Sequence, residues 1–289
     1  MSGPLLAIDG PFLLYRSFFA LPESIVGVDG HPIGGLLGAT NVILRIAAER
    51  VPRAIVVCWG AEAAAYRVAL YPGYHAQRPP VPDALAWQFE QAPDVFDAFG
   101  WGSASSPELE ADDLLGSFAT VEVAAGGGAL ILTGDRDMYQ CAGERISVLY
   151  LKMGSSGFED VDPAEVQRRY GVPPELVPDF IALRGDPSDG LPGAPGIGAK
   201  TAADLLTRHG SLEAVINAAD TERPRIAQAL RESAADLRAF RDIATLRATP
   251  VSRPADRPTD LAGGAQAARR YGMNKLADRI EQADSLAAL

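Results

Sequence analysis

The chain has few of the residues that mark disulfide-bonded, zinc-binding or membrane-spanning proteins. Its 289 residues include two cysteines, Cys58 and Cys141, far apart in the sequence, so we expect no disulfide framework and a reducing, cytoplasmic location. The three histidines are scattered, which argues against a zinc site or a histidine-based triad. There is no apolar run long enough to cross a bilayer and no signal-peptide pattern at the N-terminus. We therefore expect no membrane association.

An excess of positive charge is also missing, which weakens any prediction of nucleic-acid binding. The formal net charge is −11 at pH 7, whereas proteins that bind DNA are usually basic, at least locally. However, eight of the 37 acidic residues stand in three tight clusters and at the end of the first apolar run. Divalent cations bound among them would offset much of this charge, so the net charge does not exclude DNA binding.

These eight acids are the strongest chemical signal in the sequence. So many like charges in proximity are unfavourable unless cations lie among them, and oxygen-only ligand sets suit Mg²⁺ or Mn²⁺. A pair of such ions is the usual machinery for hydrolysing phosphodiesters. The candidate metal ligands are Asp9, Glu110, Asp112, Asp113, Asp135, Asp137, Asp186 and Asp189. The clusters therefore predict a metal-dependent nuclease.

Each cluster also has a purely structural interpretation. The acids at 110–113 could cap the free amides at the start of a helix. Those at 135–137 could belong to a turn after a strand, and those at 186–189 to a helix stop beside glycine and proline. Their joint occurrence at strand ends and adjoining helix starts favours the metal site.

Alternating strands and helices predict a parallel sheet with helices on both faces. The strands, apolar without period-two alternation, are expected at 5–8, 54–58 and 129–133. The helices of this half are expected at 34–50, 83–99 and 112–125. Between them, prolines and a glycine in 71–82 predict an irregular crossover. Ligands of such sheets gather at the carboxyl ends of the strands, where Asp9 and Asp135 fall.

The second half of the chain is predicted to be mostly helical. Helices are expected at 163–170, 174–184, 199–208 and 212–218, followed by a helical tail from 223 that prolines interrupt near 249–260. The loop GAPGIGAKT at 193–201 is not a P-loop, because that motif needs glycine directly before its lysine. We interpret it as a glycine hairpin whose amides, with the next helix N-terminus, hold a phosphate. A plain linker between two helices is the alternative.

Together these motifs resemble the 5′ nuclease (flap endonuclease) family, specifically the 5′–3′ exonuclease domain of bacterial DNA polymerase I in stand-alone form. The resemblance rests on the segments 8–10, 15–18, 110–113, 132–140, 183–193 and 196–202. It implies an α/β, PIN-like parallel-sheet core at 1–170 with a helical arch at 68–100. It further implies a C-terminal helical DNA-binding region at 171–289, with a helix–three-turn–helix module at 174–210.

The resemblance also implies roles for individual residues. One metal would be held by Asp9, Glu110, Asp112 and Asp113, and the other by Asp135, Asp137, Asp186 and Asp189, some of them through water or shared. The residues that would draw the scissile phosphate in are Arg16, Arg67, His75 and Arg78. DNA contacts are expected from Tyr15, Tyr74, Gly193, Gly196, Gly198, Lys200 and Thr201, with K⁺ at carbonyls of the glycine hairpin. The expected partner is DNA with 5′ flaps or 5′ ends, and the expected state is a monomer.

Pairs of a tyrosine and an arginine support these contacts independently. Tyr15 precedes Arg16, Tyr66 precedes Arg67, and Tyr74 stands four residues before Arg78. Such pairs can stack a base and hold its phosphate. An arginine that merely covers a core tyrosine is the alternative at each position.

The chain departs from the family pattern at two positions. The second strand of the family ends in an aspartate ligand, where this chain has Gly60 after Trp59. We therefore expect weaker metal binding at the first site, reduced activity and a gain when Gly60 is changed to Asp. The family's arch carries a Tyr-Lys-x-x-Arg pattern, where this chain has His75 in place of lysine. A largely neutral imidazole makes that phosphate contact weaker and pH-dependent.

The predicted function is a metal-dependent, structure-selective 5′ nuclease of DNA replication and repair. One alternative is a weakened paralogue that binds branched DNA without cutting it, which Gly60 and His75 favour and the eight retained acids disfavour. Another is a PIN-like ribonuclease, which the glycine hairpin for duplex DNA disfavours.

Overall fold

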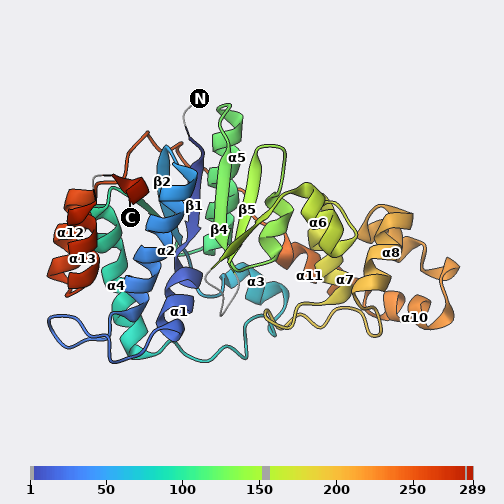
Figure 1. The fold of residues 1–289 in the computed structure, drawn as a ribbon. Coiled ribbons are helices and arrows are strands. Elements are labelled where there is room, and N and C mark those ends of the chain that lie inside the picture. Colours follow the sequence, from blue (N-terminus) through green and yellow to red (C-terminus); the bar gives the residue numbers. More distant parts are fainter. Residues whose placement is uncertain (1–2, 152–156, 284, 289) are drawn as a thin grey trace.

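The protein is built around a six-stranded sheet with helices on both sides (Figure 1). A computed structural model describes residues 3–151, 157–283 and 285–288. The strand order is β3-β2-β1-β4-β5-β6, and every neighbouring pair is parallel except β5 and β6. The strands are β1 (Leu5–Asp9), β2 (Ala54–Trp59), β3 (Gly102–Ser105), β4 (Ala129–Thr133), β5 (Ile146–Leu151) and β6 (Phe158–Val161). The predicted parallel α/β architecture is confirmed.

The helices follow the sequence pattern closely. They are α1 (Gly10–Ala20), α2 (Gly34–Arg50), α3 (Ala65–Leu70), α4 (Asp83–Ala98), α5 (Ala111–Ala124), α6 (Pro163–Tyr170), α7 (Val177–Arg184), α8 (Ala199–His209), α9 (Leu212–Asn217), α10 (Pro224–Glu232), α11 (Ala234–Ala244), α12 (Leu261–Arg270) and α13 (Asn274–Gln282). The predictions for α2 and α6 match to the residue, those for α4, α8 and α9 differ by one residue at one end, and that for α5 is shifted by one residue at both ends. Helix α7 is preceded by a separate 3₁₀ turn, Pro174–Leu176.

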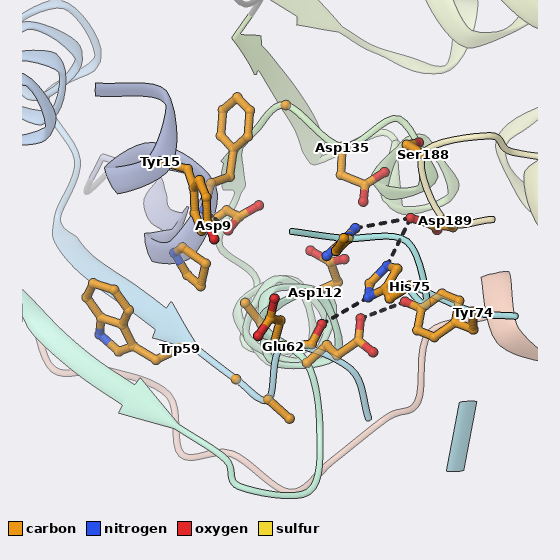
Figure 2. Close-up of a pocket in the computed structure, with 18 of the residues that line it drawn as sticks. Asp9, Tyr15, Trp59, Glu62, Tyr74, His75, Asp112, Asp135, Ser188 and Asp189 are labelled. Carbon is orange, nitrogen blue, oxygen red and sulfur yellow. Dashed lines mark hydrogen bonds and ion pairs between the residues drawn. The ribbon is translucent and has the colours of Figure 1, made fainter. Parts of the chain in front are cut away.

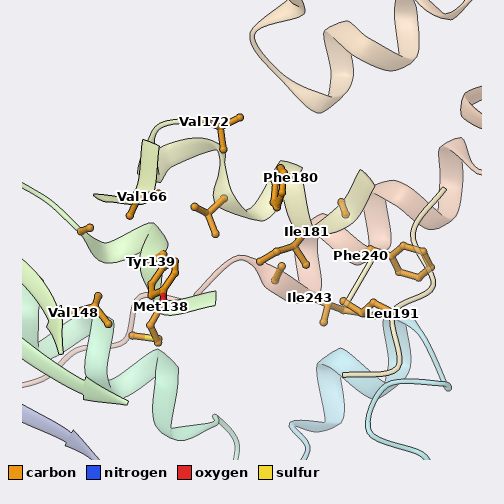
Figure 3. Close-up of a cluster of buried hydrophobic side chains, with 14 of the residues drawn as sticks. Met138, Tyr139, Val148, Val166, Val172, Phe180, Ile181, Leu191, Phe240 and Ile243 are labelled. Atoms are coloured by element: carbon orange, nitrogen blue, oxygen red, sulfur yellow. The ribbon is translucent and has the colours of Figure 1, made fainter. Parts of the chain in front are cut away.

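The central strands are buried on both faces, which explains why their sequences show no alternation. In β1, Leu5 and Ala7 belong to one hydrophobic cluster and Leu6 and Ile8 to another. The first cluster joins α5, α7 and α11 to the sheet, and Figure 3 shows part of it around Phe180 and Phe240. The second cluster lies under α1, α2 and α4. The edge strand β3 was not predicted, because its sequence GSAS has no apolar run.

The last two helices return to the sheet rather than extending the helical region. Helices α12 and α13 lie beside α4 (Figure 1), and Ala268, Leu276 and Ile280 are buried in the second cluster. The preceding segment, 246–260, has no helix or strand, as its prolines predicted. A buried ion pair between Arg53 and Glu122, joined by Arg253, ties this segment to the core. Helices α8 and α10 lie farthest from the sheet (Figure 1).

A helix that crosses a bilayer must be long and predominantly apolar. Within residues 3–151, 157–283 and 285–288, none combines the length and the apolar composition that a bilayer crossing needs.

Candidate metal centre

The carboxyl edge of the sheet opens into a cavity of about 1500 Å³. Its lining includes the last residue of β1, the first turn of α5, the loop after β4 and the loop after α7. These elements bring together Asp9, Glu110, Asp112, Asp135, Asp186 and Asp189, several of which are labelled in Figure 2. Asp9 and Asp135 thus meet at one edge of the sheet, as the topology predicts.

Asp9 is held in a fixed orientation by two donors. One of its carboxylate oxygens caps α1, accepting a hydrogen bond from the Phe12 amide at 3.0 Å. The other accepts from the Thr133 hydroxyl at 2.7 Å. Thr133 also accepts a hydrogen bond from the Asp135 amide at 3.0 Å, so this threonine links two predicted ligands. Sequence reasoning missed Thr133, although its place at a strand end directly before Gly134-Asp135 was a usable signal.

The remaining predicted ligands come from two loops. Asp135 accepts a hydrogen bond from the Asp137 amide at 2.8 Å, which closes the turn after β4. Asp186 accepts from the Ser188 amide at 2.9 Å and begins the loop that ends α7. Asp137 lies at a small adjoining cavity together with Asp112, Asp135 and Asp189. The turn after β4 and the loop after α7 therefore face each other across this edge of the sheet.

The electrostatics of this group favour a bound cation. Burial, and then the charges of Asp189 and Asp9, raise the pKa of Asp135 to about 7. The pKa values of Asp112 and Asp137 are raised well above the ordinary value, again by burial first and then by Asp135. A divalent ion would stabilise the ionised form of these neighbouring carboxylates, which repel one another. Their oxygen-only ligand chemistry suits Mg²⁺ or Mn²⁺.

The donor set therefore fits the predicted ions in its chemistry. In the part of the chain that the structure describes, the side chains as placed form no group of three or more His, Cys, Asp or Glu with the geometry of a metal site. Several of their oxygens accept hydrogen bonds instead, as those of Asp9 do. The division of the acids between two metals consequently stays a prediction.

Glu110 and Asp113 differ from the other acids, because a buried arginine neutralises both. Arg67 is 3 % exposed and contacts Glu110 at 2.5 Å and Asp113 at 3.1 Å. Glu110 also accepts hydrogen bonds from the Tyr74 hydroxyl at 2.8 Å and the Ala64 amide at 2.7 Å. Asp113 is fully buried, does not line the large cavity and accepts from a backbone amide of 246–260 at 2.7 Å.

This network bears on three sequence-based assignments. Arg67 was expected to draw in the phosphate, but its guanidinium is buried against Glu110 and Asp113. Asp113 does not line the large cavity, whereas Glu110 does line it while both of its oxygens accept hydrogen bonds. Arg67 and Asp113 therefore support the site from behind the cavity lining, whereas Glu110 and Asp112 line the cavity at the start of α5, so a metal role for Glu110 stays a prediction.

His75 and Arg78 do lie at the cavity. The imidazole of His75 is 3.1 Å from Asp189 and 2.9 Å from the carbonyl of Glu62, and its ring stacks on Tyr74 at 3.8 Å (Figure 2). Arg78 donates to Asp189 at 3.3 Å while its side chain is 41 % exposed. Of the four predicted phosphate-binding residues, these two are placed to reach a phosphate at the acids.

Arg16 is not placed to do so. It lies on the buried side of α1 and is not part of the cavity lining. Its pKa is lowered, by burial first and then by the neighbouring Arg45. A catalytic role for Arg16 stays a prediction that this arrangement does not support, because the helix turns Arg16 away from the cavity that Tyr15 lines.

The glycine hairpin between α7 and α8 has a buried and an exposed part. Gly193 is buried with φ 68°, and an added Cβ would lie 2.4 Å from the amide of Gly185, so this glycine shapes the turn. Gly196, Gly198 and Lys200 are exposed, and Thr201 is half-buried. The predicted DNA contacts that lie at the protein surface in this loop therefore all follow Gly193 in the sequence. Both predicted tyrosines line the cavity: Tyr15 is half-buried, and Tyr74 is buried.

Gly60 lies where the chain packs too closely for any side chain. A Cβ at Gly60 would lie 2.3 Å from the amide nitrogen of Ala111 and 2.4 Å from the carbonyl carbon of Glu110. The adjacent Ala61 amide donates to the carbonyl of Leu109 at 2.9 Å. The start of α5 therefore occupies this space with backbone. Gly60→Asp would therefore have to displace this backbone and could not simply add a ligand.

Comparisons with known proteins place the chain in a family. A family model described as "5′-3′ exonuclease, N-terminal resolvase-like domain" matches residues 4–171, and one described as "5′-3′ exonuclease, C-terminal SAM fold" matches residues 172–258. A 5′-3′ exonuclease of Mycobacterium tuberculosis is 36% identical, covering 98% of both chains. DNA polymerase I of Mycobacterium bovis is 35% identical over 87% of this chain, which spans 28% of that polymerase.

Solved structures agree in fold. The T5 D15 flap endonuclease, in a pseudo-enzyme-product complex with DNA and metal ions, has a TM-score of 0.66 at 19% identity and covers 99% of both chains. The catalytic core of Rad2 in complex with DNA substrate has a TM-score of 0.63 at 14% identity, covering 97% of this chain and 92% of that one. These likenesses are consistent with the predicted PIN-like fold. The chain belongs to the 5′-3′ exonuclease family.

Proposed function

We propose that this protein is a divalent-metal-dependent, structure-selective 5′ nuclease that hydrolyses DNA phosphodiesters at 5′ flaps or 5′ ends. The observation that carries the proposal is the convergence of Asp9, Asp112, Asp135, Asp186 and Asp189 on one cavity of the sheet's carboxyl edge. Family membership supports the same activity and does not favour the two alternatives, a non-cutting DNA binder and a ribonuclease.

The cavity acids would hold Mg²⁺ or Mn²⁺. Asp9 and Asp112 are the proposed ligands on one side, and Asp135, Asp137, Asp186 and Asp189 on the other. When bound, two such ions supply the acidity that activates a water molecule and neutralise charge on the scissile phosphate. Thr133 keeps the Asp9 carboxylate turned towards this edge through its hydrogen bond of 2.7 Å.

Arg78 and His75 would bring the phosphate to the acids. Both contact Asp189, and Arg78 is exposed enough to exchange that contact for a phosphate oxygen. The crossover segment that carries His75 and Arg78 is attached to the loop after α7, because the His75 amide donates to the Asp189 carbonyl at 3.1 Å. This loop leads directly into the glycine hairpin. The exposed hairpin residues Gly196, Gly198 and Lys200 would hold the duplex, with K⁺ at carbonyls of the hairpin.

We further propose action in DNA replication and repair by a cytoplasmic monomer. The proposed substrate is DNA with a free 5′ strand, and no partner protein enters the proposal.

Cleavage of end-labelled 5′-flap duplexes tests the activity. The wild type is expected to cut a DNA flap near its junction in Mg²⁺ or Mn²⁺ and to cut a matched RNA flap more slowly. Asp135→Asn should abolish cutting, whereas Asp220→Asn, at an exposed acid with 84 % of its side chain accessible, should not change it. Tight flap binding without cutting in either metal would favour the non-cutting binder, and preferential RNA cutting would favour the ribonuclease.

A further inference from the structure

Two arginines of the cavity lining have no part in the proposed chemistry. Arg136 lies between Asp135 and Asp137 in the turn after β4, and Arg184 is the last residue of α7. Both line the large cavity. Arg136 is exposed and the side chain of Arg184 is 22 % exposed, so a ligand can reach both. Together with Arg78, they give the cavity three arginines beside its acids.

Aromatic rings hold both guanidinium groups in place. The guanidinium carbon of Arg136 lies 5.6 Å from the centre of the Tyr150 ring. That of Arg184 lies 5.9 Å from the Tyr170 ring and 5.5 Å from the Phe180 ring, and these two rings are stacked at 4.7 Å. A ring face attracts a cation without neutralising its charge. Both arginines are therefore oriented in advance and keep their positive charge for a ligand.

The two arginines are neighbours in the fold. Their supporting rings are joined by Tyr139, which packs against Tyr150 at 5.8 Å and Tyr170 at 5.5 Å. Burial raises the pKa of Tyr170, and the charges of Arg184 and Arg136 both oppose that shift. The positive charges of two separate loops thus reach the same ring, so one anion in the cavity can lie near both.

The polar contacts of both side chains leave donors for such an anion. The Nε of Arg184 donates to the carbonyl of Gly185 at 2.9 Å, and its Nη2 lies 3.2 Å from Asp186. The Nε of Arg136 donates to the Tyr150 hydroxyl at 3.3 Å, and within the described part of the chain no carboxylate pairs with it. Strong charge-assisted hydrogen bonds of this kind measure about 2.7–2.9 Å. The two longer contacts are therefore weak, and a phosphate can replace them.

We propose that Arg136 and Arg184 bind one phosphate of the substrate strand on the 3′ side of the bond that is cut. The inference rests on the proposed function, because the acids must hold the scissile phosphate beside this pair. The planar guanidinium matches the geometry of a phosphate. Arg184 leads through the loop at 185–192 into the glycine hairpin, which is proposed to hold the duplex. A phosphate at Arg184 therefore belongs to the strand between the acids and the duplex.

Such a contact would determine where the strand is cut. A phosphate bound at a fixed place beside the acids sets which phosphodiester lies among Asp9, Asp112 and Asp135. Phosphate contacts fix the register of a nucleic acid on a protein and carry no sequence information. Arg136 and Arg184 would therefore act as positioning residues, and their loss should weaken substrate binding and spread the cuts over neighbouring bonds.

Neutral phosphates in a labelled 5′-flap duplex test the pair. A methylphosphonate removes the charge of one chosen phosphate, here the first or the second on the 3′ side of the cut. Single-turnover cutting in Mg²⁺ gives the enzyme concentration for half-maximal rate. In the wild type one of these substitutions should raise it about 10- to 150-fold, which is what ~1.5–3 kcal/mol for a hydrogen bond to a charged group becomes at about 1.4 kcal/mol per tenfold.

The arginine variants complete the cycle. Arg136→Gln and Arg184→Gln should weaken binding of the intact flap and give a wider spread of cut positions. In both variants the neutral phosphate should cause little further loss. Arg145→Gln is the matched control, because Arg145 is exposed, donates to the Gly126 carbonyl at 2.8 Å and does not line the cavity. It should keep the full effect of the neutral phosphate and the wild-type cut position.

The outcomes separate this inference from the proposed function. Equal losses from the neutral phosphate in wild type, Arg136→Gln and Arg184→Gln would overturn the site, as would no loss at either phosphate in the wild type; cutting of the intact flap would still support the nuclease. If thermal melting shows that Arg184→Gln is unfolded, the exposed Arg136→Gln decides alone. If intact flaps are not cut in Mg²⁺ or Mn²⁺, the proposed function fails first and this inference with it.

Discussion

Gly60 gives the sharpest prediction, because the sequence and the structure lead to opposite expectations. Sequence comparison with the family suggests that Gly60→Asp restores a metal ligand. In the structure, a Cβ at this position meets two backbone atoms, at 2.3 and 2.4 Å. Backbone cannot move aside as a flexible side chain would, so the start of α5 must shift. That shift would displace Asp112, the acid that α5 presents to the cavity.

The expected magnitude follows from overpacking. Forcing an extra carbon into a filled space costs about 1–3 kcal/mol, which corresponds to a fall in Tm of roughly 2–10 °C for a domain of this size class. Both Gly60→Ala and Gly60→Asp should show this loss, and neither should lower the Mg²⁺ concentration that half-maximal flap cutting requires. Gly102→Ala is the matched control, because a Cβ in that strand has its nearest contact at 3.5 Å.

Thermal melting and Mg²⁺-titrated flap cutting measure the two effects separately. If Gly60→Asp cuts at lower Mg²⁺ with an unchanged Tm, the close approach of α5 to the end of β2 is wrong and the family ligand can be restored by one substitution. If Gly102→Ala falls in Tm as far as Gly60→Ala, the effect is a general intolerance of this sheet to substitution and says nothing about α5.

Three further predictions address the network, the acids and the hairpin. Arg67→Met leaves Glu110 and Asp113 buried without their cation and should destabilise the protein by about 3–5 kcal/mol in urea unfolding; an unchanged midpoint would contradict the network. Without divalent ions, Tm should rise as the pH is lowered from about 8 to 6, because a carboxyl such as Asp135, with its pKa raised to about 7, binds protons more tightly in the folded than in the unfolded state. Saturating Mg²⁺ should remove that dependence, and a Tm that instead falls with pH in this window would refute it. Gly193→Ala should lower Tm, because the position has φ 68° and its Cβ would meet backbone at 2.4 Å; equal stability would show that the hairpin can relax.

Strands β1, β2 and β4 could be predicted because their burial is visible in their sequence, whereas β5 and β6 were not predicted. Leu5 to Ile8 are apolar at every position because both faces of β1 are covered, and the prolines before Asp83 mark where α4 begins. β3 could not be predicted, since an exposed edge strand of glycine, serine and alanine has neither an apolar run nor an alternation.

The site was predicted in its chemistry but not in the partners of each acid. The sequence shows that Glu110 and Asp113 lie three residues apart on one face of a helix. It does not show which residue packs against that face. Arg67, distant in sequence, fills that place, whereas Asp112 points to the cavity. Similarly, a tyrosine–arginine dipeptide on α1 sends Tyr15 to the cavity and Arg16 to the other side. Which of these side chains faces the cavity, and which partner it contacts, depends on tertiary packing. The local sequence pattern does not encode that packing.

The central claim is that the acids of the cavity form a centre for divalent ions, and calorimetric titration with Mn²⁺ tests it most directly. The account predicts saturable binding of two ions per chain, with loss of at least one ion in Asp135→Asn and none in the exposed-acid control Asp220→Asn. Binding that is absent in the wild type, or unchanged by Asp135→Asn, would contradict it.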